Sequence, residues 1–465
     1  MLWTRRHFIK SASALTLTPA LPSFVGPVIA RDGFLEITAG PSKQKLFRED
    51  GPSSDLWTYN GNAPGPEIRA KRGERVRVRF INNLEEPSSI HWHGIRIANA
   101  MDGVAGLTQE AVPTGGSFGY DFIAPDAGTY WYHAHNRSWN QVARGLYGAL
   151  IVEDENSSFD PDHDLTLVID DWRLTDDGTL ETASLGNLME WAHGGRLGNW
   201  LTVNGQPSPE HMLRKGEPYR LRLINACNAR VLELDPNRFG GLITAYDGQS
   251  LGRAEQLNYS PFLLGPAQRV DLLIAPDDDF AIEEISGDQT YAFATFKVTG
   301  KATERPRPRL PTPNAIPEPD LANARRVALD MTGGAMGNLQ NITFQGKKLE
   351  GDDFRRTGQV WAFNGVANMA ETPLFSAAKD ETVILEVENN TSWLHAIHVH
   401  GHHFRVIARS GAELDDGQPW RDTFLIGAGQ KVEIAFVTDN KGKWLFHCHM
   451  LEHAAAGMTT WFEVT

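Results

Sequence analysis

The chain has 465 residues, of which 41% are hydrophobic and 22% are charged, and its formal net charge is -14 at pH 7. This length predicts a globular protein of about three domains, at roughly 150 residues each. The acidic balance and the lack of Lys and Arg clusters argue against a nucleic-acid partner, because a phosphate backbone is bound through such clusters.

The first thirty residues have the pattern of an export signal. The segment TRRHFIK, from Thr4 to Lys10, carries a twin-arginine pair, and a weakly apolar stretch and a small-residue end, VIA, follow it. We therefore predict a signal peptide over residues 1–30, export by the twin-arginine (Tat) machinery, and a periplasmic mature protein. No other apolar run approaches the roughly 20 residues that span a bilayer, so no membrane span is expected.

A strand-rich pattern occurs three times along the chain. An apolar run ends in Asn-Gly in LWTYNGNAPGP, WLTVNGQPSPE and VWAFNGVANMA, and a segment of alternating apolar and polar residues follows each copy. Asn-Gly indicates a turn, and alternation is typical of half-buried strands. The pattern predicts an all-β chain with three similar domains, over residues 31–154, 155–300 and 321–465. A proline-rich linker is predicted over residues 301–320.

In the first and third copies, one His-x-His pair begins nine residues after the aligned Asn82 or Asn389, and a second pair begins five residues after Gly128 or Gly442. The second copy has no pair at these places. The pairs are His91/His93, His133/His135, His398/His400 and His447/His449. Alternate side chains of a strand share a face, so each pair presents two imidazoles to one side. Imidazole ligation suits Zn, Cu, Fe and Ni. Four pairs in register predict a metal centre between the outer copies.

Cys448 lies between His447 and His449, so its side chain must point to the opposite face of the same strand. His395 lies upstream, and His453 and Met458 follow by five and ten residues. Two histidines, one thiolate and a weak axial methionine form the trigonal site of blue copper. A disulfide to Cys227 would consume this thiolate, so we expect Cys227 to be a buried free cysteine.

The segments HWHG, WYHAH, HAIHVHGHHF and HCHMLEHAAAGM occur in the order and spacing of the copper-binding segments of multicopper oxidases. From about Asp32 to Thr465 the chain resembles a three-domain, laccase-like bacterial member of that family. The resemblance implies three consecutive cupredoxin-like Greek-key domains and four copper ions. By position, type 1 copper would take His395, Cys448, His453 and Met458. Type 2 copper would take His91 and His398. The two type 3 copper ions would take His93, His133, His135, His400, His447 and His449.

The resemblance also implies a reaction: one-electron oxidation of a small reducing substrate at type 1 copper, and four-electron reduction of dioxygen to water at the trinuclear cluster. Cys448 would connect the two sites. Asp102, nine residues after His93, matches a family acid that assists oxygen reduction, and its alternative interpretation is a turn aspartate before Gly103. Many bacterial relatives carry a second acid where this chain has Ala454. Asp102 with water, or Glu452, could compensate, or turnover could be slower.

Substrate specificity is less well determined by the sequence. The nine methionines form no Met-rich segment, and Asp415 and Asp416 have the pattern of solvated loop acids. Phenols and aromatic amines are therefore the favoured donors, with oxidation of Cu(I), Fe(II) or Mn(II) as the alternative. A non-enzymatic cupredoxin scaffold is a remote third possibility. A complete ligand set in one chain suits a monomer. Three remaining histidines are expected to be ordinary surface or loop residues: His163, His193 and His211.

Overall fold

The computed structural model describes residues 28–29, 33–258, 261–286, 290–302, 305–412, 414 and 417–465. Almost all of the predicted signal peptide lies outside these residues, as do Asp415 and Asp416. The chain is 44% strand and 8% helix, which confirms the all-β prediction. Within the described ranges, no helix is both long enough and apolar enough to cross a membrane.

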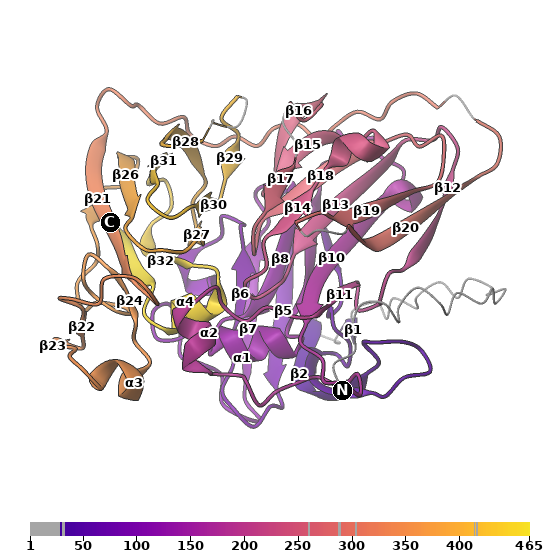
Figure 1. The fold of residues 1–465 in the computed structure, drawn as a ribbon. Helices are drawn as coiled ribbons and strands as arrows, with labels where there is room; N and C mark the ends of the chain where they lie inside the picture. Colours follow the sequence, from indigo (N-terminus) through magenta and orange to yellow (C-terminus); the bar gives the residue numbers. More distant parts are fainter. Residues whose placement is uncertain are drawn as a thin grey trace.

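The N-terminal unit contains nine strands in two sheets (Figure 1). One sheet has the order β1-β2-β5-β7 with β3 paired to β2, and the other has the order β4-β9-β8-β6. A short helix, α1 (Ser138–Gln141), follows β8. The strands are β1 (Val28–Ile29), β2 (Leu35–Gln44), β3 (Ser54–Tyr59), β4 (Ile68–Lys71), β5 (Arg75–Asn82), β6 (Ile90–His93), β7 (Ser117–Ile123), β8 (Gly128–Ala134) and β9 (Tyr147–Glu153).

The middle unit is built around a six-stranded sheet of order β11-β10-β13-β18-β15-β16. The remaining strands form two smaller sheets, and helix α2 (Leu188–Ala192) lies between β10 and β11. The strands are β10 (Asp164–Trp172), β11 (Trp200–Val203), β12 (Glu210–Arg214), β13 (Tyr219–Asn225), β14 (Leu232–Leu234), β15 (Leu242–Tyr246), β16 (Gln249–Glu255), β17 (Phe262–Leu264), β18 (Arg269–Ile274), β19 (Phe280–Glu284) and β20 (Tyr291–Thr299).

The C-terminal unit combines a six-stranded sheet, β24-β21-β26-β31-β28-β29, a five-stranded sheet, β25-β33-β32-β27-β30, and the two-stranded pair β22-β23. Its helices are α3 (Asp353–Thr357) and α4 (Leu451–Ala455). The strands are β21 (Arg325–Gly333), β22 (Thr343–Phe344), β23 (Lys347–Lys348), β24 (Trp361–Phe363), β25 (Ser376–Ala377), β26 (Thr382–Asn389), β27 (His395–Val399), β28 (Phe404–Arg409), β29 (Trp420–Arg421), β30 (Thr423–Ile426), β31 (Lys431–Val437), β32 (Gly442–Cys448) and β33 (Thr459–Val464).

The three units share one strand order, as the sequence repeat predicts. The orders are β3-β2-β5-β7, β11-β10-β13-β18 and β24-β21-β26-β31, and in each the two central strands are parallel. The Asn-Gly pair after the first strand of each set forms a tight turn. Asn60, Asn204 and Asn364 have φ of 54°, 51° and 48°, and the following glycines also have positive φ. A two-residue hairpin loop of this type needs positive φ at both positions, and Asn-Gly is the pair that accepts it most readily.

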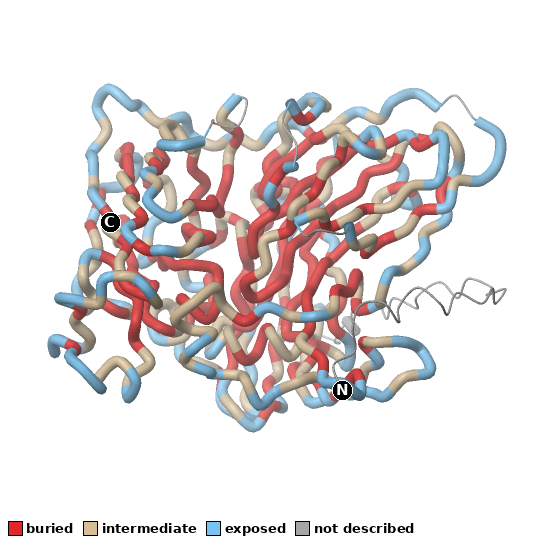
Figure 2. Tube along the Cα trace, viewed as in Figure 1, coloured by how far each residue is buried: buried red, intermediate tan, exposed pale blue. Residues whose placement is uncertain are grey.

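Burial follows the predicted alternation only where one face of a strand is open. Strand β5 alternates between buried and partly exposed positions. Strands β6, β8 and β27 are buried at every position, and buried segments run through the middle of the molecule (Figure 2). These three strands carry predicted ligands, so their histidines are held in the interior of the protein rather than on a surface.

The proline-rich segment contacts all three units. The Asn314 side-chain amide donates to the carbonyl oxygen of Ala127 and to Oε1 of Gln249, at 2.8 Å in each case. Further along, Arg405 pairs with Glu318. The segment therefore packs along the N-terminal and middle units before it enters the C-terminal unit.

Candidate metal centre

Strand pairing places the predicted ligands side by side. Strand β6 pairs with β8 so that His91 lies opposite His133, and β27 pairs with β32 so that His398 lies opposite His447. Directly opposed residues of antiparallel strands have neighbouring side chains. Each outer unit therefore presents its histidines as one compact group.

The two groups meet where the N-terminal and C-terminal units pack together. The His91 ring stacks on His400 with centroids 3.9 Å apart, and the His93 ring stacks on His398 at 3.7 Å. Both contacts join one unit to the other, and they are equivalent under the twofold pseudosymmetry of the repeats. We call the eight side chains the histidine cluster: His91, His93, His133, His135, His398, His400, His447 and His449.

Within the histidine cluster, ligand atoms gather in sets of three within 4.8 Å of one another. The sets are His91/His93/His398, His93/His133/His449 and His135/His400/His447. Each set combines residues of both outer units. Such spacing allows several metal ions to be held close together, each by two or three imidazoles.

Four nitrogens of the histidine cluster are buried without a hydrogen-bond partner: Nε2 of His91, Nδ1 of His93, Nε2 of His398 and Nδ1 of His449. A buried polar atom without a partner is costly, so these nitrogens fit metal ligation. Burial also lowers the pKa of most of the imidazoles, which keeps them in the neutral form that binds metals. Six imidazoles have a pKa well below the usual value for histidine: His93, His133, His135, His398, His400 and His449.

A second group, which we call the cysteine site, consists of His395, Cys448 and His453. The Cys448 Sγ lies 3.6 Å from Nδ1 of His395 and 3.7 Å from Nδ1 of His453, and the two Nδ1 atoms are 3.0 Å apart. All three residues are completely buried. Three donor atoms in such a triangle match the equatorial ligands of a trigonal copper site.

The outer nitrogens of the cysteine site are held by other groups. The Nε2 of His395 lies 2.9 Å from the Thr391 hydroxyl, and Nε2 of His453 lies 2.6 Å from the carbonyl oxygen of His193. Such contacts fix the orientation of each ring and leave both Nδ1 atoms free for a metal. Burial raises the pKa of the Cys448 thiol to about 12, so the thiolate needs a cation beside it.

Met458 is buried beside the cysteine site. Its carbonyl oxygen accepts from the Cys448 amide at 3.0 Å, and its own amide donates to the carbonyl oxygen of His453 at 2.9 Å. The backbone therefore holds Met458 against two of the three donors. The residue belongs to the same buried cluster as Cys448.

Asp102 contacts histidines of both outer units. It follows the short helix η2 (Asn99–Met101), and its carbonyl oxygen lies 2.8 Å from Nδ1 of His91. Its Oδ2 lies 3.0 Å from Nδ1 of His400. Gly103 has a φ of 82°, and a Cβ there would lie 1.8 Å from the carbonyl oxygen of Ile90. Asp102 does precede a glycine turn, but that turn packs it into the histidine cluster.

Comparison with known proteins accounts for this donor set. The family model described as multicopper oxidase matches residues 42–157, and a second model with that description matches residues 342–465. Lac15 from a marine microbial metagenome is 37% identical, with a TM-score of 0.73, over 92% of this chain and 99% of that structure. The chain belongs to the multicopper oxidase family. A multicopper oxidase from Pseudomonas thermotolerans is 30% identical, with a TM-score of 0.78, over 92% of this chain and 98% of that structure. The multicopper oxidase mco of Staphylococcus aureus is 28% identical over 96% of this chain and 92% of that relative.

Family membership confirms several predictions. The protein is an oxidoreductase with dioxygen as electron acceptor, and the four-copper arrangement is typical of its family. The cupredoxin-like fold is also confirmed. Cys227 is a buried free cysteine in this multicopper oxidase, as expected.

Asp422, which lies between β29 and β30, is a functional residue that the sequence pattern does not predict. Its carbonyl oxygen is 2.9 Å from Nδ1 of His398, and its Oδ1 is 3.3 Å from Nε2 of His93. Asp102 makes the corresponding contacts from the N-terminal unit. The backbone carbonyl of each aspartate contacts a histidine of its own unit, and the carboxylate contacts a histidine of the other outer unit. The segment WRDTF carries no metal-ligand pattern that would have singled out its aspartate.

His193 lies in a turn after α2, in keeping with the expected surface or loop position, but its backbone also contacts the cysteine site. Its carbonyl oxygen accepts from His453, as described above. Helix α2, which ends just before His193, packs against α4 (Figure 1). The middle unit therefore covers the outer edge of the cysteine site although it carries none of the predicted metal ligands.

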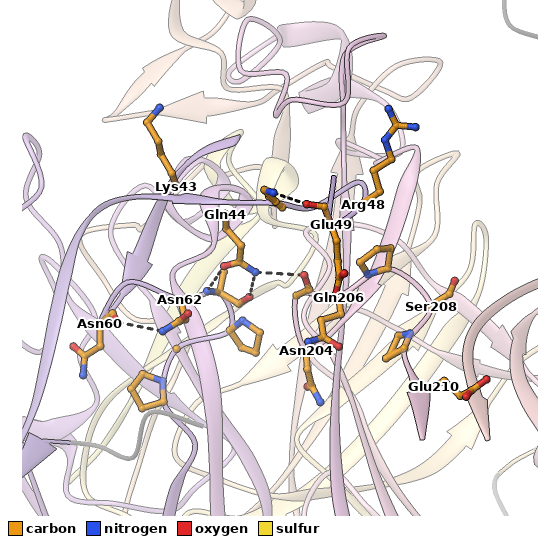
Figure 3. A pocket seen from close by; sticks show the side chains of 18 residues that line it. Lys43, Gln44, Arg48, Glu49, Asn60, Asn62, Asn204, Gln206, Ser208 and Glu210 are labelled. Atoms are coloured by element: carbon orange, nitrogen blue, oxygen red, sulfur yellow. Dashed lines mark hydrogen bonds between the residues drawn. The ribbon is translucent and has the colours of Figure 1, made fainter. Parts of the chain in front are cut away.

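A surface groove of about 920 Å³ lies elsewhere, between the Asn-Gly turns of the N-terminal and middle units (Figure 3). Gln44 bridges its walls by donating to the carbonyl oxygens of Ala63 at 2.9 Å and Gly205 at 3.4 Å. None of the predicted site residues lines this groove. Its position follows from the packing of two repeats against each other.

Proposed function

We propose that the cysteine site holds type 1 copper through His395, Cys448, His453 and Met458, and that the histidine cluster holds the other three ions. Type 2 copper would be held by His91 and His398, and the type 3 pair by His93, His133, His135, His400, His447 and His449. Bound copper supplies one-electron acceptance at the first site and four-electron reduction of dioxygen to water at the second. The observation that carries this assignment is the set of unpartnered buried nitrogens beside a separate thiol triangle.

Cys448 is the proposed connection between the two sites. It lies in the cysteine site, whereas its neighbours His447 and His449 contact His400 and His133 at 3.1 Å and 3.3 Å. Only a few covalent bonds separate the thiol from either imidazole. Four electrons from the donor must reach the histidine cluster for each dioxygen, and the end of β32 is the shortest covalent route to it.

Asp102 is the proposed relay for the four protons that dioxygen reduction consumes, and solvent water supplies these protons one after another. Its carboxylate lies among imidazoles of the histidine cluster, where it can hold a proton at Oδ2 and deliver it. Ala454 provides no acid at the other position known from relatives. Glu452 is buried and accepts from Asn228 of the middle unit at 2.8 Å. Asp102 is therefore the acid best placed for this role.

Small aromatic donors are the proposed substrates. The ring of His453 is completely buried, so an electron enters along its hydrogen bond to the carbonyl of His193 rather than by direct contact with the ring. Half-buried indoles lie in the same region. Trp191 precedes His193 by two residues, and the ring of Trp393 lies 5.4 Å from the His193 ring. Indole faces suit the stacking of a phenol or an aromatic amine.

One observation favours Cu(I) as a second candidate donor. Met189 in α2 is 64% exposed, and Met336 is 81% exposed. Their segments are joined by a hydrogen bond from the Ala335 amide to the carbonyl of Ala192. Thioethers suit Cu(I). The fold thus brings two exposed methionines towards one surface region although the sequence has no Met-rich segment.

The two candidates can be separated by measuring oxygen uptake of the copper-loaded protein with a phenol, Fe(II) and Cu(I). We expect the phenol to give the highest kcat/KM. The double variant Met189→Leu/Met336→Leu should lower kcat/KM for Cu(I) by about tenfold, because leucine keeps the volume but removes the sulfur ligand. The rate with the phenol should stay unchanged.

Met212→Leu is the matched control, since Met212 is 54% exposed on β12, a strand of the middle unit. If Cu(I) gives the highest kcat/KM, metal-ion oxidation becomes the main function. If no donor supports oxygen uptake and little copper binds, the scaffold interpretation replaces both.

We further propose that residues 1–30 direct Tat export to the periplasm, and that three domains span residues 31–154, 155–300 and 321–465 around the linker 301–320. Replacing Arg5 and Arg6 by lysine should retain the precursor in the cytoplasm, because the twin-arginine pair is the recognised feature. Cell fractionation measures this. Unchanged export of the double variant would contradict the assignment. The shared strand order supports the domain boundaries.

A further inference from the structure

Arg269 is a completely buried arginine of the middle unit that contacts both outer units. It begins β18, and its Nε donates to the carbonyl oxygen of Thr129 on β8 at 3.1 Å. Its two terminal nitrogens donate to the two carboxylate oxygens of Asp422, at 2.9 Å and 2.6 Å. Such a pair of parallel hydrogen bonds, here called the fork, fixes a carboxylate in position and orientation, and a lysine cannot form it.

Asp422 in turn contacts imidazoles assigned to two different copper sites. Its carbonyl oxygen lies 2.9 Å from His398, and its Oδ1 lies 3.3 Å from Nε2 of His93. The opposite nitrogens of both rings, Nε2 of His398 and Nδ1 of His93, are the unpartnered ones. The Asp422 contacts therefore determine which nitrogen of each ring faces the metal.

The two equivalent aspartates differ in their surroundings. Both contact histidines, but Asp422 is also paired with the Arg269 guanidinium, which lies 3.8 Å from Asp247. The backbone amide of Arg269 donates to Asp247 as well, at 3.0 Å. The guanidinium thus fixes the position of the Asp422 carboxylate, whereas no arginine contact is found for the Asp102 carboxylate among the described residues.

We propose that Arg269 is a positioning residue for the trinuclear copper cluster, acting through Asp422 on His93 and His398. The middle unit, which supplies no ligand, would then complete the cluster that the outer units form. This inference rests on the ligand assignment under Proposed function. It goes beyond that assignment by making the geometry of the cluster depend on a third unit.

The test compares Arg269→Gln with Arg222→Gln in the copper-loaded protein. Arg222 is the matched control, because it is also buried in the middle unit and also contacts Thr129, at 2.7 Å, but pairs with Asp164 instead of Asp422. In Arg269→Gln we expect copper affinity of the cluster to fall by about 10- to 100-fold and the type 2 EPR signal to shift, with the blue absorption retained. Arg222→Gln should lose thermal stability without either change.

Two further variants, Asp422→Asn and the double variant Arg269→Gln/Asp422→Asn, show whether Arg269 acts through Asp422. We expect the double variant to resemble Asp422→Asn alone, because the two residues form one unit. If Arg269→Gln fails to fold, Arg269→Lys keeps the charge without the fork and should show a smaller shift of the EPR signal.

Wild-type copper content and an unchanged EPR signal in Arg269→Gln would overturn the inference, as would an equal shift in Arg222→Gln. Failure of the wild-type protein to bind about four copper ions would instead overturn the proposed function, so the two failures are distinguishable.

Discussion

Replacing Cys448 with serine is expected to abolish the blue absorption and to lower oxygen uptake with every donor by about 1000-fold or more, because residues that act as a unit lose nearly all activity together. Serine keeps the shape of the side chain but removes the thiolate of the cysteine site. It also interrupts the link between the cysteine site and the histidine cluster. Visible absorption, copper content and oxygen uptake measure these effects.

Cys227→Ser is the matched control for this variant, since Cys227 is the other buried free cysteine. It should keep the blue absorption and the full turnover rate. Cys448→Ser should still bind copper at the histidine cluster, because none of the eight imidazoles is changed. A Cys448→Ser protein that stays blue, or that oxidises a phenol at the wild-type rate, would contradict the assignment of the thiol.

Replacing Asp102 with alanine is expected to slow reoxidation of the reduced enzyme by dioxygen by about 100-fold, while the blue absorption remains. The carboxylate lies 3.0 Å from His400, and the variant removes the only proposed proton relay at the histidine cluster. Stopped-flow reoxidation of the fully reduced protein measures this step separately from electron entry.

Asp102→Asn separates the two roles that the geometry allows. Asparagine keeps the contacts to His91 and His400 but carries no exchangeable carboxyl proton. If Asn is as slow as Ala, the residue supplies protons. Recovery of the rate in Asn would show that Asp102 only positions the imidazoles, and an unchanged rate in Ala would remove both roles.

Several features of this protein follow from short-range sequence pattern. The alternation of side chains along a strand has period two, so His447 and His449 must share a face and Cys448 must point to the other. The structure places His447 and His449 in the histidine cluster and Cys448 in the cysteine site. The Asn-Gly turns are local in the same sense, since their positive φ angles depend on two residues.

The contributions of the middle unit could not be predicted in the same way. Arg269 and the carbonyl of His193 carry no metal-ligand pattern, and each acts on a residue more than 150 positions away. Asp422 resembles an ordinary aspartate of a strand end. The two exposed methionines, Met189 and Met336, are far apart in the chain, so a search for a Met-rich segment cannot find them.

The sequence alone thus determined the strand repeat, the pairing of the histidines and the face on which each histidine and Cys448 lies, because these depend on backbone geometry within a few residues. Only the tertiary structure decided which imidazoles meet across the two outer units, which aspartates hold them, and what covers His453. Those contacts depend on how the three units pack together, and packing is determined by the sum of many weak interactions over whole surfaces rather than by any local pattern.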